Sequence, residues 1–235
     1  MISYIVATMW RYEPFADFIK DLTQHHLIGE IIIIDNHPEL RPNNLVQHEK
    51  IKILTTGVNI FVNPAWNWGV AESKYDKLVI ANDDLIFDMR VFNKIYDYII
   101  PEYGASGLSV RSNEMHNVDG VIRINEWVPG SNTFGFPMLM FIHKQSWTRI
   151  PANLNIYFGD NFIFDNSLWS NKKIHLISDI FYYSPYGQTG KSDSEFAKYL
   201  RNQFEKEKKI YAELIKTKGL NPRHWCPEHY ADYEE

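Results

Sequence analysis

The run Lys77-Leu-Val-Ile-Ala-Asn-Asp-Asp84 constrains the fold of this chain more than any other segment. Its apolar residues follow one another without alternation, which indicates a strand buried on both faces, as in a parallel sheet. Such strands end at the edge where open α/β sheets bind ligands, so we expect Asp83 and Asp84 there. Adjacent carboxylates repel unless a cation or donors compensate them, which favours a divalent metal carrying a phosphorylated ligand. A solvated turn built from Asn and Asp fits the same residues equally well.

Further apolar runs alternate with helical patterns through the first half of the chain. We expect strands over residues 3–8, 30–35, 51–54 and 76–81, and helices over 13–22 and 63–73. Alternation of this kind predicts parallel βαβ units. The sequence therefore predicts an α/β fold with a mostly parallel central sheet flanked by helices.

The second half continues this pattern less regularly. We expect a helix over 91–100, a strand over 104–110 and a long loop or short meander over 111–136. A strand over 137–142 and a short helix over 143–148 follow, and residues 157–160 open a segment that becomes helical through 168. A last strand over 174–183 and a charged helix over 194–216 complete the pattern. No linker interrupts residues 1–190, so we predict one domain there, with residues 191–235 as a C-terminal helix and acidic tail.

Composition excludes several classes of protein. The net charge of -5 argues against a protein that coats nucleic acid, and the single Cys226 excludes a disulfide framework or a cysteine-rich zinc site. No segment resembles a signal peptide or a membrane span, which predicts a soluble, cytoplasmic protein. The basic excess within 191–223 is typical of a solvated helix face, although a basic helix can also dock on an anionic membrane.

The order of these elements resembles the family 2 glycosyltransferases of the GT-A fold, which use nucleotide sugars. Residues 3–8 and 31–36 look like the first two strands of that family, and 63–69 looks like its Asn/Gly-rich helix start. Asn82-Asp83-Asp84 is similar to the Asp-x-Asp signature, with Asn in the first position. Gly159-Asp160-Asn161 resembles the motif that supplies the base in inverting members. The resemblance covers roughly residues 1–190.

The resemblance implies that Asp84 ligates Mn²⁺ or Mg²⁺, which neutralises the departing diphosphate, and that Asp83 contacts the donor ribose or sugar. Asn82 would bind ribose or simply cap the turn. Asp160 would remove the proton of the acceptor hydroxyl in an inverting transfer. A second interpretation makes Asp160 the N-cap of the helix that follows it.

Five further residues are candidates for ligand contacts. Thr8 and Arg11 would contact the base and the diphosphate, and Asp35 would bind the base or ribose or else form a turn. Asn67 would orient the donor loop or cap its helix, and Trp127 would serve as an acceptor platform or pack in the core.

The resemblance also has a gap. Many metal-dependent members carry a His after the last strand, and residues 182–190 contain none, while Lys191 beyond them would reach phosphate. The acceptor stays open between a glycan, a lipid-linked sugar, a protein and modified nucleic acid. Two other functions compete: a nucleotidyltransferase, although residues 7–12 lack the glycines of a phosphate loop, and a non-catalytic module that binds nucleotide sugars.

Overall fold

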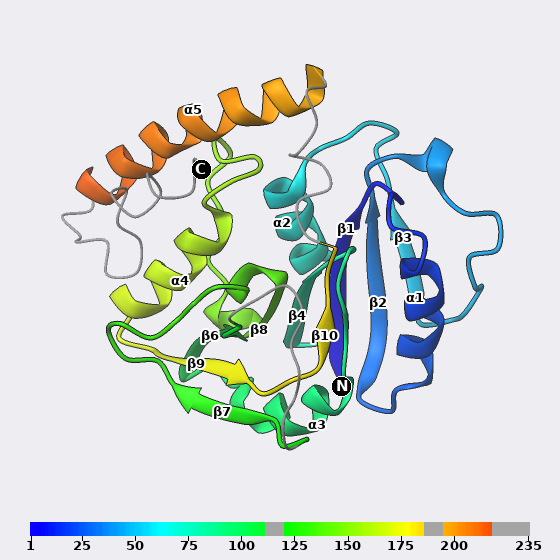
Figure 1. Cartoon of the computed structure of the whole chain (residues 1–235), viewed down its shortest axis with the longest axis horizontal. Coiled ribbons are helices and arrows are strands. Elements are labelled where there is room, and N and C mark those ends of the chain that lie inside the picture. The colour runs from blue at the N-terminus through cyan, green and yellow to red at the C-terminus, as the bar shows by residue number, and fades with distance from the viewer. Residues whose placement is uncertain (111–119, 186–194, 218–235) are drawn as a thin grey trace.

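The computed structural model describes residues 1–110, 120–185 and 195–217, and its elements form layers of helix, sheet and helix (Figure 1). The strands of the large sheet are β1 (Ile2–Thr8), β2 (Ile28–Asp35), β3 (Ile51–Leu54), β4 (Lys77–Asn82), β6 (Tyr103–Leu108), β7 (Arg123–Glu126), β8 (Leu139–His143) and β9 (Lys173–Ser178). A second, two-stranded sheet joins β5 (Ile86–Phe87) to β10 (Tyr182–Tyr183). The α-helices are α1 (Phe15–Gln24), α2 (Val62–Glu72), α3 (Arg90–Ile95), α4 (Gly159–Trp169) and α5 (Glu195–Thr217).

The eight strands of the large sheet lie in the order β3-β2-β1-β4-β8-β6-β9-β7. Strands β3, β2, β1 and β4 are parallel, and β8 runs antiparallel between β4 and β6. In β1, Thr8 pairs with Asp35 of β2 and Ala7 pairs with Asn82 of β4. The carboxyl ends of these three strands therefore meet at one edge of the sheet.

Both faces of the parallel half are buried, as the continuous apolar runs predicted. In β2, Ile31 and Ile33 belong to the core beneath α1 and α3, whereas Ile32 and Ile34 belong to the core beneath α2 and α4. Burying an Ile side chain contributes about 1.5–3 kcal/mol before the entropic cost of ordering it. Strand β2 has no polar face, so it is stable only inside the sheet, between β3 and β1.

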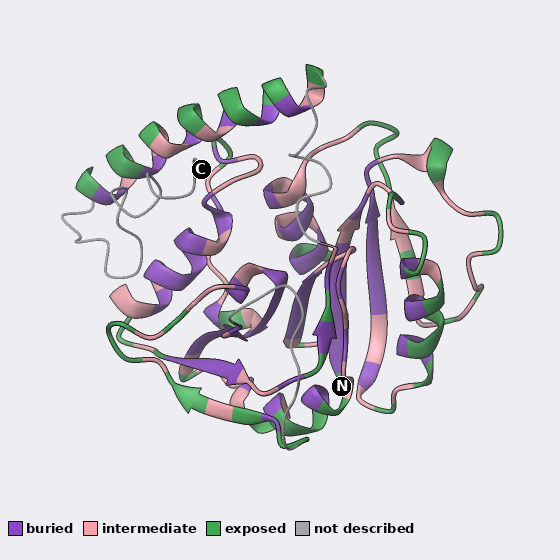
Figure 2. Cartoon of the chain, in the orientation of Figure 1, coloured by how far each residue is buried: buried purple, intermediate pink, exposed green. Residues whose placement is uncertain are grey.

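Helix α5 covers the α2–α4 side of the molecule with one stripe of its surface (Figure 2). Its buried residues recur every three or four positions, which is the period of an amphipathic helix. They are Ala197, Leu200, Gln203, Glu207, Tyr211 and Ile215. In the described ranges no helix is long and apolar enough to cross a membrane.

The structure corrects several of the predicted elements in the second half. The single strand expected over 174–183 is wrong: β9 ends at Ser178, and Asp179 adopts a left-handed backbone with φ of 56°. Asp tolerates this conformation better than most residues do, and the chain turns there so that β10 leaves the large sheet and pairs with β5. The helix expected over 91–100 ends at Ile95 and continues as a 3₁₀ turn over Tyr96–Tyr98. Short 3₁₀ turns also occupy Pro38–Leu40, Phe136–Met138 and Lys144–Ser146.

Candidate active site

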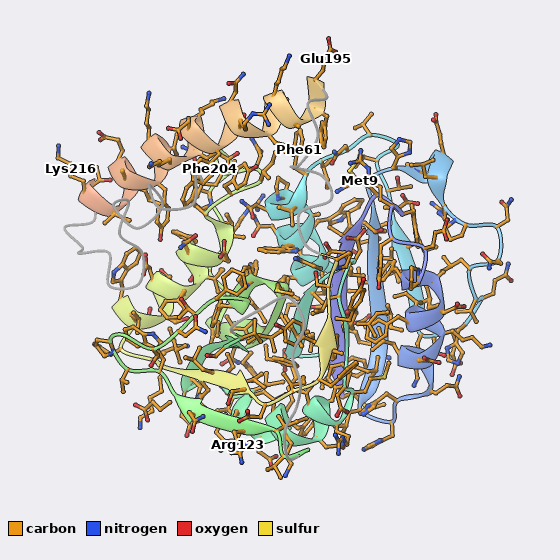
Figure 3. All side chains as sticks on the ribbon, viewed as in Figure 1. Met9, Phe61, Arg123, Glu195, Phe204 and Lys216 are labelled. Atoms are coloured by element: carbon orange, nitrogen blue, oxygen red, sulfur yellow. The ribbon has the colours of Figure 1, made fainter. Side chains whose placement is uncertain are left out.

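A cavity of about 440 Å³ lies at the carboxyl ends of β1 and β4, between α2 and the first turns of α5. Figure 3 labels Met9 and Phe61, which contribute to its walls beneath the N-terminal end of α5. The residues that line it are Ala7, Thr8, Met9, Arg11, Tyr12, Asn36, Asn59, Phe61, Val62, Trp66, Ala81, Asn82, Asp83, Asp84, Ile156, Tyr157, Phe196 and Leu200. Five of the residues singled out in the sequence are therefore brought together there: Thr8, Arg11, Asn82, Asp83 and Asp84.

The two adjacent carboxylates have different surroundings. The Thr8 hydroxyl donates a hydrogen bond of 2.6 Å to Asp83 Oδ2 and accepts one of 2.8 Å from the backbone N–H of Trp10. The pKa of Asp83 is raised to about 6, chiefly by burial and also by the charge of Asp84, while the Thr8 hydrogen bond opposes the shift. Burial also raises the pKa of Asp84. Both side chains thus hold negative charge that is poorly solvated at the cavity.

This pair of carboxylates fits a divalent cation that is shared with a phosphorylated ligand. Within the described part of the chain, neither Asp83 nor Asp84 forms an ion pair with a basic side chain. Among the same residues no group of three or more His, Cys, Asp and Glu side chains could hold a metal. Mg²⁺ takes one or two carboxylates and fills its shell with water and phosphate oxygens, so the available donors suit it.

Left-handed backbone conformations lie around this cavity. Trp10, Phe61 and Phe158 have φ values of 59°, 65° and 59°, although none of them is a glycine. Phe61 lines the cavity, and Trp10 and Phe158 directly follow the lining residues Met9 and Tyr157. Non-glycine residues in this region cost of order 1–3 kcal/mol each and cluster at functional sites, where the surrounding structure enforces them.

Asp160 lies in the first turn of α4, three residues after Tyr157, and it does not line the cavity itself. Burial raises the pKa of its carboxyl group to about 6, while backbone N–H groups of Asn161 and Asp160 oppose the shift. The alternative interpretation of Asp160 as the N-cap is wrong, because Phe158 occupies that position. A Cβ atom on the preceding Gly159 would lie 2.1 Å from Asn63 Oδ1, so glycine permits α4 to start against α2.

Asp35 is buried beside the cavity but does not line it. Its carboxylate accepts a 2.6 Å hydrogen bond from Arg41 Nε and one of 3.0 Å from the backbone N–H of His37. The next residue, Asn36, reaches the cavity instead. The turn interpretation of Asp35 therefore describes the contacts seen here.

The structure does not bring Asn67 or Trp127 to the cavity. The Asn67 amide donates to the backbone oxygen of Ile150 and accepts from the backbone N–H of Ile150 and from Trp147 Nε1. Trp127 packs edge-on against Phe164 with ring centroids 5.4 Å apart. These contacts tie loops to the core, so they support neither donor binding by Asn67 nor an acceptor platform at Trp127.

Sequence reasoning missed the contribution of α5 to the cavity. Phe196 and Leu200 line it, and the Arg11 guanidinium lies 5.3 Å from the centroid of the Phe196 ring. The amphipathic spacing of α5 was a signal that one face packs on the protein, but it does not indicate where. Two predictions lie outside the described residues: the phosphate contact of Lys191 and the acidic tail within 218–235. The segment 182–190, which lacks a His, is described only as far as residue 185.

Comparisons with known proteins identify the fold. No family model matches the sequence, and no curated protein matches it. Solved structures of TarS from S. aureus do match: residues 1–349 of TarS in complex with UDP-GlcNAc align over 91% of this chain and 66% of that chain, with 12% identity and a TM-score of 0.57. The complex with UDP aligns over 78% and 60%, with 14% identity and a TM-score of 0.53. A longer TarS structure aligns over 78% and 36%, with 14% identity and a TM-score of 0.55.

TarS is a glycosyltransferase of the GT-A type, so the GT-A-like α/β fold predicted from the sequence is confirmed. This chain spans between about a third and two thirds of the length of these TarS chains. Identities of 12–14% establish a common fold and leave the activity to the residues of the site.

Proposed function

We propose that this protein is a glycosyltransferase that moves a sugar from a nucleoside-diphosphate sugar to an acceptor hydroxyl, with the help of a divalent cation. The observation that carries the proposal is the cavity at the ends of β1 and β4, into which Asp83 and Asp84 project from the sheet edge. Open α/β sheets bind ligands at this edge. The same fold holds UDP and UDP-GlcNAc in the TarS complexes, which makes a uridine nucleotide the first donor to test.

The cavity matches such a donor in size and chemistry. Its volume of about 440 Å³ lies within the range of small-molecule sites, and aromatic walls surround a few polar groups. Asn36 and Asn59 offer amides suited to a base or ribose, and Arg11 offers a planar donor that suits phosphate. Asn82 lies beside the acids and would contact the ribose.

Asp84 would hold Mg²⁺ or Mn²⁺ at this site, because its carboxylate lines the cavity and is not engaged by a basic side chain in the described ranges. When bound, the cation would supply charge neutralisation for the departing diphosphate. Asp83 is oriented by Thr8 and would accept hydrogen bonds from the donor ribose or sugar. Thr8 thus acts on the donor through Asp83.

Asp160 would act as the general base of an inverting transfer. A carboxyl group whose pKa lies at about 6 is mostly ionised at neutral pH, so it can accept the proton of the acceptor hydroxyl. The acceptor oxygen then forms a bond to the anomeric carbon as the bond from that carbon to the diphosphate breaks. Asp160 follows the wall residue Tyr157 by three positions, in the first turn of α4.

A donor panel tests the proposal. Calorimetric titration with UDP-GlcNAc, UDP-glucose and GDP-mannose, each with Mn²⁺ or with EDTA, should reveal at least one donor whose binding needs the metal. Slow release of the nucleoside diphosphate should accompany that binding, because water replaces the missing acceptor. Binding without any release, even with acceptors added, would point to a non-catalytic module. No binding by any nucleotide sugar would refute the proposal.

A further inference from the structure

We propose that Glu207 of α5 is a positioning residue of the candidate site: it fixes the loop Asn155–Tyr157 that forms one wall of the cavity and leads into Asp160. The inference deepens the proposed function and rests on it, since the site is the one described above. It also makes α5 part of the site, although the sequence suggested a tail beyond the domain.

The Glu207 carboxylate is completely buried, and the backbone of this loop surrounds it. Oε1 accepts hydrogen bonds of 2.9 Å from Asn155 N–H and 3.2 Å from Ile156 N–H. Oε2 accepts bonds of 3.1 Å from Ile156 N–H and 2.7 Å from Tyr157 N–H. The Gln203 amide, one helical turn earlier, donates a further bond of 2.6 Å to Oε1. One side chain thus satisfies the N–H groups of consecutive residues.

This arrangement is an anion-binding concavity of successive backbone N–H groups, and the protein fills it with its own carboxylate. Without Glu207, these buried donors would lose their acceptor, which costs more than an ordinary hydrogen bond contributes. The loop has no regular secondary structure to hold it. Its conformation therefore depends on Glu207 more than a helix or a strand would.

The loop is held from its other side by the start of α2. The backbone N–H of Asn63 donates to the oxygen of Asn155 over 3.0 Å, and Asn63 Nδ2 donates to the oxygen of Tyr157 over 3.0 Å. Glu207 takes the N–H groups and Asn63 takes the carbonyl groups, so the loop is clamped between α5 and α2. Ile156 and Tyr157 then lie in the cavity wall, and the backbone reverses at Phe158 to begin α4.

Aromatic packing carries the same connection along α5. Phe204, labelled in Figure 3, lies on the side of α5 that faces the rest of the protein. Its ring meets Tyr157 edge-on at 5.2 Å, and Phe158 at 5.4 Å. Phe158 also stacks on Tyr211 at 5.4 Å. On α5, two residues before Glu207, Phe196 and Leu200, line the cavity. Phe204 and Tyr211, on either side of Glu207, pack against the residues that lead to Asp160.

Replacement Glu207→Gln tests the clamp with little change in size. The NH₂ group of glutamine donates hydrogen bonds and cannot accept them from the backbone N–H groups that the second carboxylate oxygen of Glu207 serves. We therefore expect the N–H groups of residues 155–157 to exchange with deuterium at least about tenfold faster. We expect the KM for the donor to rise about tenfold and kcat to fall, since wall and base both lose their support. A loss of stability alone lowers the folded fraction and leaves the KM unchanged.

Tyr211→Phe is the matched control. It removes a different buried bond between α5 and α4, the 2.5 Å bond from Tyr211 Oη to Asp165, and leaves every Glu207 contact in place. We expect a similar fall in melting temperature, no selective exchange at 155–157 and a donor KM within about twofold of the wild-type value. An equal rise in KM in both variants would overturn the specific role of Glu207.

The outcomes separate this inference from the proposed function. Hydrogen exchange is measured without any ligand, so unchanged exchange at residues 155–157 in Glu207→Gln refutes the clamp whatever the protein binds. Faster exchange with unchanged KM and kcat refutes the positioning role and leaves Glu207 as a structural residue. Failure of the wild-type protein to bind any nucleotide sugar refutes the proposed function, and with it the role assigned to Glu207 at that site.

Discussion

The Thr8 hydroxyl at the end of β1 donates a 2.6 Å hydrogen bond to Asp83, the residue that directly follows β4. The two strands are neighbours in the sheet, and their register sets Ala7 opposite Asn82. Thr8 therefore fixes the side chain of Asp83 and leaves Asp84 to face the cavity without this restraint. The different surroundings of the two acids thus arise from the pairing of β1 with β4.

Thr8→Val should weaken donor binding without unfolding the protein. Valine has the same shape but cannot donate, so Asp83 loses the hydrogen bond from Thr8 and is held only by backbone N–H groups. We expect donor affinity to fall about tenfold, measured by calorimetry with Mn²⁺ present. Thr8→Ser keeps the hydroxyl and should bind within about twofold of the wild-type protein. Equal losses in both variants would mean that the methyl group matters and the hydrogen bond does not.

Asp84→Asn should remove the dependence of donor binding on the metal. The amide is a weaker ligand for a hard cation than a carboxylate, so the gain in affinity between EDTA and Mn²⁺ should largely disappear. Asp88→Asn provides the control, because Asp88 is four residues away and pairs with Arg90 at the surface. A full metal response in Asp84→Asn would assign the cation to another residue.

Transfer should rise with pH through a pKa of about 6, because only the ionised carboxylate of Asp160 accepts a proton. The profile of kcat/KM against pH from 4.5 to 8 measures the pKa of this group in the free protein. Asp160→Asn should keep donor affinity, since Asp160 does not line the cavity, and should lose at least about a hundredfold in kcat. If Asp160→Asn keeps its kcat and transfer still falls at low pH, a different base or a retaining mechanism is at work.

Stability should fall as pH rises from about 4 to above 6, and Asp165 should contribute to that fall. Burial raises the pKa of Asp165 to about 6 in the folded protein, although the bond from Tyr211 opposes the shift. In the unfolded chain the value is about 3.9, so the folded state holds the proton more tightly. The resulting stabilisation is complete below pH 4 and is lost as pH rises through 6.

Urea unfolding of the wild-type protein and of Asp165→Asn at pH 4.5, 5.5 and 7 gives the free energy of unfolding at each pH. The contribution of Asp165 is the difference between the two proteins in the slope of this free energy against pH. The Asp88→Asn control should give a small difference of the opposite sign, because Arg90 lowers the pKa of Asp88. Parallel slopes for wild type and Asp165→Asn would show that Asp165 stays charged in the folded protein.

The sequence predicted the parallel half of the fold well, because runs such as Ile31–Ile34 leave few alternatives to a central strand. It also placed Asp83 and Asp84 at the sheet edge, because they directly follow β4, whose end meets that of β1. It could not assign Asn67 or Trp127, whose partners Ile150 and Phe164 are distant in sequence. Periodicity reports that a residue is buried and does not report what it touches.

The break at Asp179 and the contacts of α5 were beyond sequence reasoning for a related reason. Ser178 and Asp179 interrupt the apolar run only briefly before Ile180 resumes it, and two polar residues do not by themselves reveal a left-handed backbone. The segments that form β9 and β10 therefore looked like one strand. Glu207 occurs in a segment crowded with Lys and Glu, where a buried acid is indistinguishable from its exposed neighbours. Only the loop that surrounds it reveals its role.

The position of Glu207 also sets the order in which the site is completed as the protein is made. Helix α5 is synthesised after every other described element. The strands of the sheet can therefore pair before α5 emerges from the ribosome. Until then the N–H groups of Asn155–Tyr157 have no carboxylate to bind, and the cavity lacks the wall formed by Phe196 and Leu200. A nascent chain stopped before Glu207 would therefore carry both acids of the sheet edge and still lack a finished site.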